Sequence, residues 1–112
     1  MSKKVYNKTT SAGAKSLIAS ACPSRLCGLS GYSANASAQF IQVHDSASLP
    51  ANGSVPKIVF KAGASSNFGV DFNENPREFE NGVFVCTSTT YATLTLGATD
   101  DCWFDVQLKA GG

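Results

Sequence analysis

The sequence predicts an all-β protein, folded as a single antiparallel β-sandwich with a jelly-roll or immunoglobulin-like topology. Short apolar segments alternate with polar residues at a period of two, and Gly, Pro, Asn and Asp punctuate the chain every several residues. No segment carries a strong helical periodicity. At 112 residues the chain fits one domain, with a core large enough to fold without disulfides or metals. We therefore expect about seven to eight strands.

The N-terminal segment differs in composition from the rest of the chain. It is rich in Lys, Ser, Ala and Thr, and its only sustained apolar signal is Leu17-Ile18. We predict an extended N-terminal arm over residues 1–22, ordered by a neighbouring molecule, and a β-sandwich domain over residues 23–112. Lys3 and Lys4 in this arm are candidate protein contacts.

The first two expected strands of the sandwich cover residues 25–32 and 38–44. Gly28 and Gly31 interrupt the first strand, and glycine inside a strand indicates a bend, a bulge or the close approach of another backbone. Tyr32, at the end of this strand, is a candidate protein contact. The second strand contains the run Gln-Phe-Ile-Gln-Val, whose β-branched and aromatic residues favour extended structure.

The next strands are separated by clear turn signals. Residues 55–61 begin with a Val-Pro pair, and the missing N–H of proline is tolerated at the start of a strand. Residues 67–73 alternate, with three apolar side chains facing inward. Asn81-Gly82 is a hairpin signal in front of residues 83–89. Shorter strands are expected at residues 78–80 and 93–96, and the expected core phenylalanines are Phe40, Phe60, Phe68, Phe72, Phe84 and Phe104.

The last expected strand, residues 101–109, has two unlike faces. Its apolar face consists of Cys102, Phe104, Val106 and Leu108, and its polar face of Trp103, Asp105, Gln107 and Lys109. Trp103 is the only tryptophan in the chain, and tryptophan is enriched at protein interfaces. We therefore predict that the polar face contacts another molecule, with Trp103, Asp105 and Gln107 as candidate contact residues.

Composition narrows the range of partners. The net charge is +1, and charged residues make up only 15% of the chain, against about 25% in typical domains. Such a chain has no general attraction to nucleic acid or to an anionic membrane, and we expect neither as a partner. No apolar stretch is long enough for a signal peptide or a transmembrane helix, so we expect a cytosolic protein.

The sequence offers no set of residues that makes a catalytic or metal site. His44 is the only histidine, and Asp45 beside it would point to the opposite face of a strand, so the pair does not form a dyad. The acidic residues between positions 71 and 80 lack a calcium-loop pattern, and no phosphate-binding glycine motif occurs. We predict a non-enzymatic protein without a cofactor or metal. A structural assembly protein and a carbohydrate- or peptide-binding module remain as functional classes.

The chain has four cysteines, Cys22, Cys27, Cys86 and Cys102. Free thiols are the default in a reducing compartment. Four residues separate Cys22 from Cys27, which is wider than the spacing of a C-x₂-C zinc knuckle. Disulfides pairing Cys22 with Cys27, or Cys86 with Cys102, remain open for a particle that matures in oxidising surroundings.

Several short motifs occur in order along residues 26–109. They are Q-F-I-Q-V-H-D followed by L-P, then G-V-F-V-C-T-S-T, then D-C-W-F-D-V-Q. As a set they resemble small virion proteins encoded among the structural genes of tailed bacteriophages. The resemblance implies a β-sandwich component of the virion that is assembled in the host cytoplasm and carries no catalytic residues. Its partners would be the major capsid protein or other virion proteins.

Within that group of proteins, we expect a capsid decoration (cement) protein. Such a protein would stabilise the head by bridging neighbouring capsomers through many weak contacts. Self-association as a dimer or trimer would match a symmetry axis of the lattice. A small tail or neck component and a head fibre are alternatives within the virion, and a carbohydrate-binding β-sandwich module is a further alternative.

Overall fold

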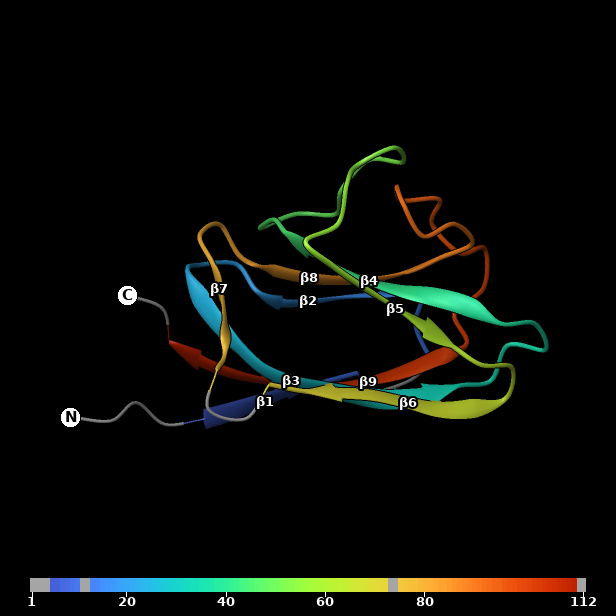
Figure 1. Cartoon of the computed structure of the whole chain (residues 1–112), viewed down its shortest axis with the longest axis horizontal. Coiled ribbons are helices and arrows are strands. Elements are labelled where there is room, and N and C mark those ends of the chain that lie inside the picture. The colour runs from blue at the N-terminus through green and yellow to red at the C-terminus, as the bar shows by residue number, and fades with distance from the viewer. Residues whose placement is uncertain (1–4, 11–12, 73–74, 111–112) are drawn as a thin grey trace.

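The computed structural model describes residues 5–10, 13–72 and 75–110. These residues form nine strands and no helix, arranged as two antiparallel sheets packed face to face (Figure 1). The predicted all-β sandwich is therefore confirmed, with one strand more than the expected upper number. The strands are β1 (Val5–Thr9), β2 (Ser16–Ser20), β3 (Ser24–Ser33), β4 (Gln39–Asp45), β5 (Ile58–Ala62), β6 (Ser66–Asp71), β7 (Arg77–Phe79), β8 (Val83–Ser88) and β9 (Cys102–Ala110).

The two layers have different strand orders. One layer, which we call the open sheet, has the order β1-β9-β3-β6, with β7 also paired to β3. The other layer, the covered sheet, has the order β2-β8-β4-β5. In β3 a register shift between Leu26 and Gly28 inserts Cys27 as an extra residue opposite β9. Because of this bulge, Arg25 and Gly28 both pair with outward-facing residues of β9.

The main core lies between the sheets, where alternate residues of the central strands face inward. Phe68 of β6 packs against Phe60 and Phe104, with ring centroids 6.1 Å and 5.9 Å away. The apolar face predicted for the last strand is confirmed, since all four of its residues are fully buried. Further fully buried residues of this core are Leu26, Ile41, Val43, Val83 and Val85.

The core also contains Phe79, which was not among the predicted core residues. Phe79 is 2% exposed and belongs to the three-residue strand β7, which is too short to show an alternating pattern. Three of the six predicted core phenylalanines are only half-buried, namely Phe40, Phe60 and Phe72. The other three are buried.

The N-terminal segment is not an arm where the structure describes it. Strand β1 pairs with β9 at the edge of the open sheet, and β2 pairs with β8 at the edge of the covered sheet. The predicted boundary between an arm, residues 1–22, and a sandwich therefore falls within the sandwich. Amino-acid composition did not indicate β1 or β2 as strands, because an edge strand of a sandwich needs few apolar residues and is often polar.

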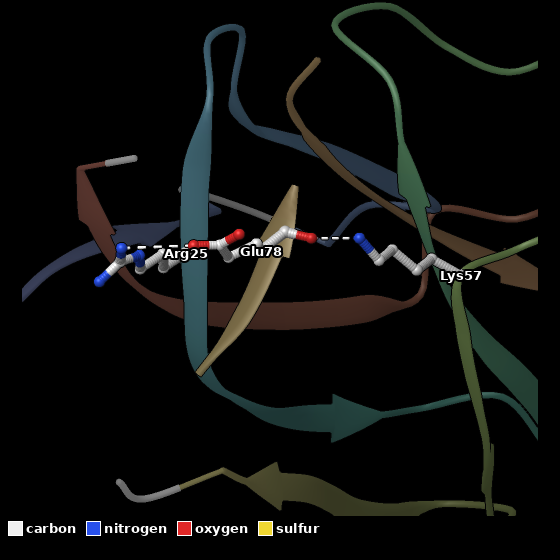
Figure 2. Close-up of polar contacts among 3 residues, drawn as sticks. All are labelled: Arg25, Lys57 and Glu78. Atoms are coloured by element: carbon white, nitrogen blue, oxygen red, sulfur yellow. Dashed lines mark hydrogen bonds and ion pairs between the residues drawn. The ribbon is translucent and has the colours of Figure 1, made fainter. Parts of the chain in front are cut away.

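Strand β7 links the two sheets at one end of the sandwich (Figure 1). The Glu78 carboxylate forms an ion pair with Arg25 of β3 at 3.3 Å, and the Glu78 backbone carbonyl accepts a hydrogen bond from Lys57 Nζ, next to β5 (Figure 2). The Lys57 ammonium also lies 4.8 Å from the centroid of the Phe79 ring. Because the ion pair is exposed, its energy is small, and the buried Phe79 ring contributes most of the stability at this end.

The strand expected at residues 93–96 is instead part of a loop. A single bridge between Ser88 and Leu96 joins it to β8 in the described structure. Its other backbone bonds go to a second loop: the Leu94 N–H donates to Ser54 O and the Gly53 N–H donates to Leu94 O, both at 2.8 Å. The loops that contain residues 53–54 and 93–96 are therefore joined by backbone hydrogen bonds.

Candidate contact surfaces

The outer face of the covered sheet is buried by the protein's own loops. Residues 46–57 and 89–97 lie over β4 and β8 and form what we call the roof (Figure 1). Beneath the roof, Phe84, Cys86 and Leu94 make a small apolar cluster separate from the main core. Strand β8 is therefore buried on both faces, which explains its continuous apolar run of Val-Phe-Val-Cys.

Gln42 fastens the roof to the covered sheet. Its fully buried side chain projects from β4, and its Nε2 donates to the backbone oxygens of Thr90, Tyr91 and Thr93 at 2.9, 3.3 and 3.0 Å. Its Oε1 lies 2.9 Å from His44 Nε2. Because an amide oxygen only accepts hydrogen bonds, this histidine nitrogen carries a proton. One side chain thus supplies several of the bonds that hold the loop.

The roof also carries exposed apolar side chains. Val55 is 76% exposed, Tyr91 65% and Leu49 50%, the largest values among the large apolar side chains of the described residues. The Tyr91 ring packs on one side against Phe40, with ring centroids 5.9 Å apart. Sequence reasoning missed this surface because its residues lie in loops and show no periodicity. The Leu49-Pro50 pair, in an otherwise polar loop, was the available signal.

The outer face of the open sheet, which we call the open face, lies on the opposite side of the sandwich, away from the roof (Figure 1). Register places its residues in rows across the strands. From one end of the face to the other, the β3–β9 pairs are Tyr32 with Trp103, Ser30 with Asp105, Gly28 with Gln107, and Arg25 with Lys109.

Four of the six predicted contact residues share the open face. Tyr32 and Trp103 are direct cross-strand neighbours, each 43% exposed. Asp105 and Gln107 follow along β9, and Asp105 Oδ1 accepts a hydrogen bond from Asn7 Nδ2 at 3.0 Å. The other two predicted contacts, Lys3 and Lys4, lie outside the described residues.

The middle of the open face is hollowed. A depression of about 370 Å³ is lined by Leu29, Ser30, Gly69, Val70, Asp71 and Gln107. Gly28 and Gly69 have no side chain, so nothing projects from these two positions above the sheet. A Cβ added to Gly28 would lie 2.9 Å from Gln107 Oε1, whereas a Cβ added to Gly69 would meet its nearest atom at 3.4 Å, an ordinary contact.

Charge is distributed unevenly along the open face. The acidic residues Asp71 and Asp105 lie in its two middle rows, and the Asp105 row is next to the aromatic pair. The cations Arg25 and Lys109 form the row at the other end, where Arg25 pairs with Glu78. The face therefore has an aromatic end and a cationic end.

His44 and Asp45 each form hydrogen bonds within the fold. His44 is buried in β4 and faces Gln42 under the roof. Asp45 accepts hydrogen bonds from the backbone N–H groups of Glu80, Asn81 and Gly82 at 3.2, 2.8 and 3.4 Å, and so holds the turn before β8. The two side chains are committed to different partners and do not contact each other as a catalytic dyad would.

All four cysteines are free thiols in the structure. Burial raises the pKa of Cys86 to about 12 and that of Cys102 to about 11. Thiolate is the reactive form, so both are inert at neutral pH. Cys22 is exposed and Cys27 half-buried.

Metal ligands are not gathered in the described part of the chain. No group of three or more His, Cys, Asp or Glu side chains there could hold a metal ion. Within the same residues, no helix is long and apolar enough to cross a membrane.

The free energy of unfolding should fall when the pH is lowered from about 7.5 to about 5. Burial lowers the pKa of His44 below its ordinary 6.5. As the pH drops through 6.5, the unfolded chain takes up this proton before the folded protein does, so stability is lost. His44→Gln, whose amide can still donate to Gln42, should remove this loss. Urea unfolding of both proteins at the two pH values measures it, and an unchanged pH dependence in the variant would assign the loss to another group.

A further loss of stability is expected below pH 3.8, because two aspartates also have lowered pKa values. Burial alone would raise the pKa of Asp45, but hydrogen bonds from three backbone N–H groups and the charge of Lys57 lower it. Burial likewise opposes the shift at Asp101, where hydrogen bonds from Thr99, Gln39 and Asn35 lower the pKa.

Comparison with known proteins returned no relatives: no family model matches the sequence, and neither the curated proteins nor the solved structures contain a significant match.

Proposed function

We propose that this protein is a non-enzymatic virion structural protein, a capsid decoration (cement) protein of a tailed bacteriophage. One observation carries the proposal: a single sandwich presents two candidate contact surfaces on opposite sides, the roof and the open face (Figure 1). A chain with two opposed surfaces can join two other molecules, as a bridging protein must. The motifs along residues 26–109 that resemble phage virion proteins support the virion context.

In this proposal the roof docks on the major capsid protein, and the open face meets a neighbouring decoration subunit. Leu49, Val55 and Tyr91 supply exposed apolar area for the first contact. The roof loops carry a single charged residue, Lys57, and this low charge lowers the cost of desolvating the roof. Each contact is small, and the repetition of copies over a capsid lattice supplies the total strength. Internal pressure would have to break many such bridges to separate the capsomers.

Capsid binding tests the proposal. The purified protein should pellet with expanded, undecorated capsids, and the double variant Leu49→Ser/Val55→Ser should bind at least about tenfold more weakly because it removes apolar contact area. Ile18→Ser is the matched control, because it makes the same kind of change at an exposed position of β2 outside the roof loops. Wild-type protein that does not pellet with capsids would contradict the proposal, and pelleting with tails would favour a tail or neck component.

A carbohydrate-binding module is the second candidate function. It is favoured by the hollow of the open face, where Asp71 and Gln107 line a depression two rows from the Tyr32–Trp103 pair. Planar polar side chains that share a face with exposed aromatic rings suit an extended polar ligand. Glycan-array binding that disappears in Trp103→Ala would support this function in place of decoration.

A further inference from the structure

We propose that the open face is the contact between two copies of this chain. The copies are related by a two-fold axis that lies in the interface and runs across the strands. The aromatic end of each copy then lies over the cationic end of the other. This inference rests on the proposed function for its biological role, because it names the occupant of one of the two surfaces. The dimer itself can be measured without a capsid.

Symmetry determines which residues meet. A two-fold axis across β9 at the level of Val106 exchanges positions 103 and 109, and also positions 105 and 107. Trp103 of one copy therefore lies over Lys109 of the other. On the neighbouring strand β3, Tyr32 lies over Arg25 of the second copy, because these residues pair in register with Trp103 and Lys109.

The chemistry of these pairs is complementary. A Lys or Arg cation over the face of a Trp or Tyr ring is attracted by the ring quadrupole. Between the two ends, the Gln107 amide of one copy can donate to the Asp105 carboxylate of the other. Asp105 Oδ1 is already held by Asn7, which orients the carboxylate. Each contact occurs twice in the dimer.

The charges also select this axis over the alternative. If the axis ran along the strands, each row would meet itself: with the axis on β9, Lys109 would lie over Lys109 and Asp105 over Asp105, and with the axis between β3 and β9, Lys109 would lie over Arg25. Like charges directly opposed across an interface are repulsive. The uneven distribution of charge along the open face is thus self-complementary in one orientation only.

The shape and size of the face fit a weak dimer. Gly28, Gly69 and Ser30 keep the middle rows low, so that two faces can approach closely. Four strands about 4.8 Å apart and about seven residues long give a face of roughly 400 Å² per copy. About 800 Å² in total lies below the ~1,000 Å² of a stable interface, so we expect a reversible dimer with a dissociation constant on the order of tens of micromolar.

Sedimentation velocity over a concentration series tests the dimer, and two positions test its geometry. Trp103→Lys would place two lysines together, and Lys109→Glu would place a carboxylate on a ring face. Each substitution should weaken association about tenfold or more, because every contact occurs twice in a two-fold symmetric dimer. The double variant Trp103→Lys/Lys109→Glu places the introduced lysine of one copy beside the introduced glutamate of the other. This new ion pair should recover association to within about threefold of the wild type.

The recovery is diagnostic because positions 103 and 109 lie about 20 Å apart on one strand, beyond the distance at which they can couple within a copy. Val55→Ser on the roof is the control and should leave the dissociation constant unchanged. Thermal melting checks that every variant is folded.

Two results would overturn the inference: a wild-type protein that stays monomeric at millimolar concentration, or a double variant whose loss equals the sum of the two single losses. Failure of the proposed function is a separate outcome. A dimer that does not bind capsids would contradict decoration alone, and a monomer that binds capsids would contradict the dimer alone.

Discussion

Replacing Gln42 by Leu should lower the free energy of unfolding by about 3 kcal/mol or more. The volume of the side chain changes little, but the backbone oxygen of Tyr91 and the Nε2–H of His44 lose the partner that Gln42 provides. The backbone oxygens of Thr90 and Thr93 lose one bond each and keep those from Ser88 Oγ and Thr90 Oγ1. A group that stays buried costs about 1–3 kcal/mol when left unpaired. Partial opening of the roof to water would recover some of this cost and would expose the small core beneath it.

Gln107→Leu is the matched control for this prediction. It makes the same chemical change on the open face, where the side chain is only half-buried, and should alter stability by less than about 0.5 kcal/mol. Urea unfolding measures both variants, and limited proteolysis reports cleavage within residues 89–97. A Gln42→Leu protein with wild-type stability and an intact roof would show that packing, not this amide, holds the loop.

Gly31→Ala should destabilise the protein by about 3 kcal/mol or more. A Cβ at this position would lie 1.9 Å from the backbone oxygen of Trp103 and 2.7 Å from the ring of Phe68. Real atoms do not approach so closely, so β3 and β9 would have to separate where they pair. Overpacking of a core costs about 1–3 kcal/mol when side chains can move, and more when backbone must move.

Gly69→Ala tests whether this effect belongs to the position or to glycine in general. Gly69 lies on β6, one strand from Gly31, but faces outward, and its added Cβ would make only ordinary contacts of 3.4 Å or more. Alanine should therefore be neutral, or stabilising by about 0.5–1 kcal/mol, because it reduces the freedom of the unfolded chain. Equal losses in the two variants, measured by urea unfolding, would rule out the steric explanation.

These predictions share one structural cause, the unequal covering of the two sheets. The roof converts the outer face of β4 and β8 into a second interior, so Gln42 and His44 must satisfy each other there. The open sheet keeps its outer face exposed. In the proposed function, contact with other molecules falls to the open face and to the top of the roof. The polar groups between the roof and the covered sheet stabilise the fold.

The all-β class could be predicted because it depends on local alternation. The two faces of residues 101–109 were correct residue by residue, since a period of two is visible within nine residues. The glycines of β3 correctly indicated a bulge near Gly28 and a close backbone approach at Gly31. Grouping Tyr32 with Trp103 as candidate contacts agreed with their shared face, although only the register shows that they are neighbours.

The predictions that were wrong concern features that depend on contacts between distant residues, which a local sequence pattern does not show. Strands β1 and β2 have the composition of an arm, and only their pairing with β9 and β8 makes them strands. Phe79 is buried because β7 crosses the end of the sandwich, not because of its neighbours in sequence. The segment 93–96 resembles a strand, yet its backbone bonds go mostly to another loop.

The sequence by itself determined that this chain is a β-sandwich with a two-faced final strand. Those properties follow from the order of apolar and polar residues over a few positions, because successive side chains of a strand point to opposite faces of the sheet. The tertiary structure decided which outer face is covered and which is open, because that depends on two loops, whose bonded residues are about forty positions apart in sequence, meeting over β4 and β8. Which sheet face the loops cover depends on contacts between distant parts of the chain, and this covering is what makes the two candidate contact surfaces different.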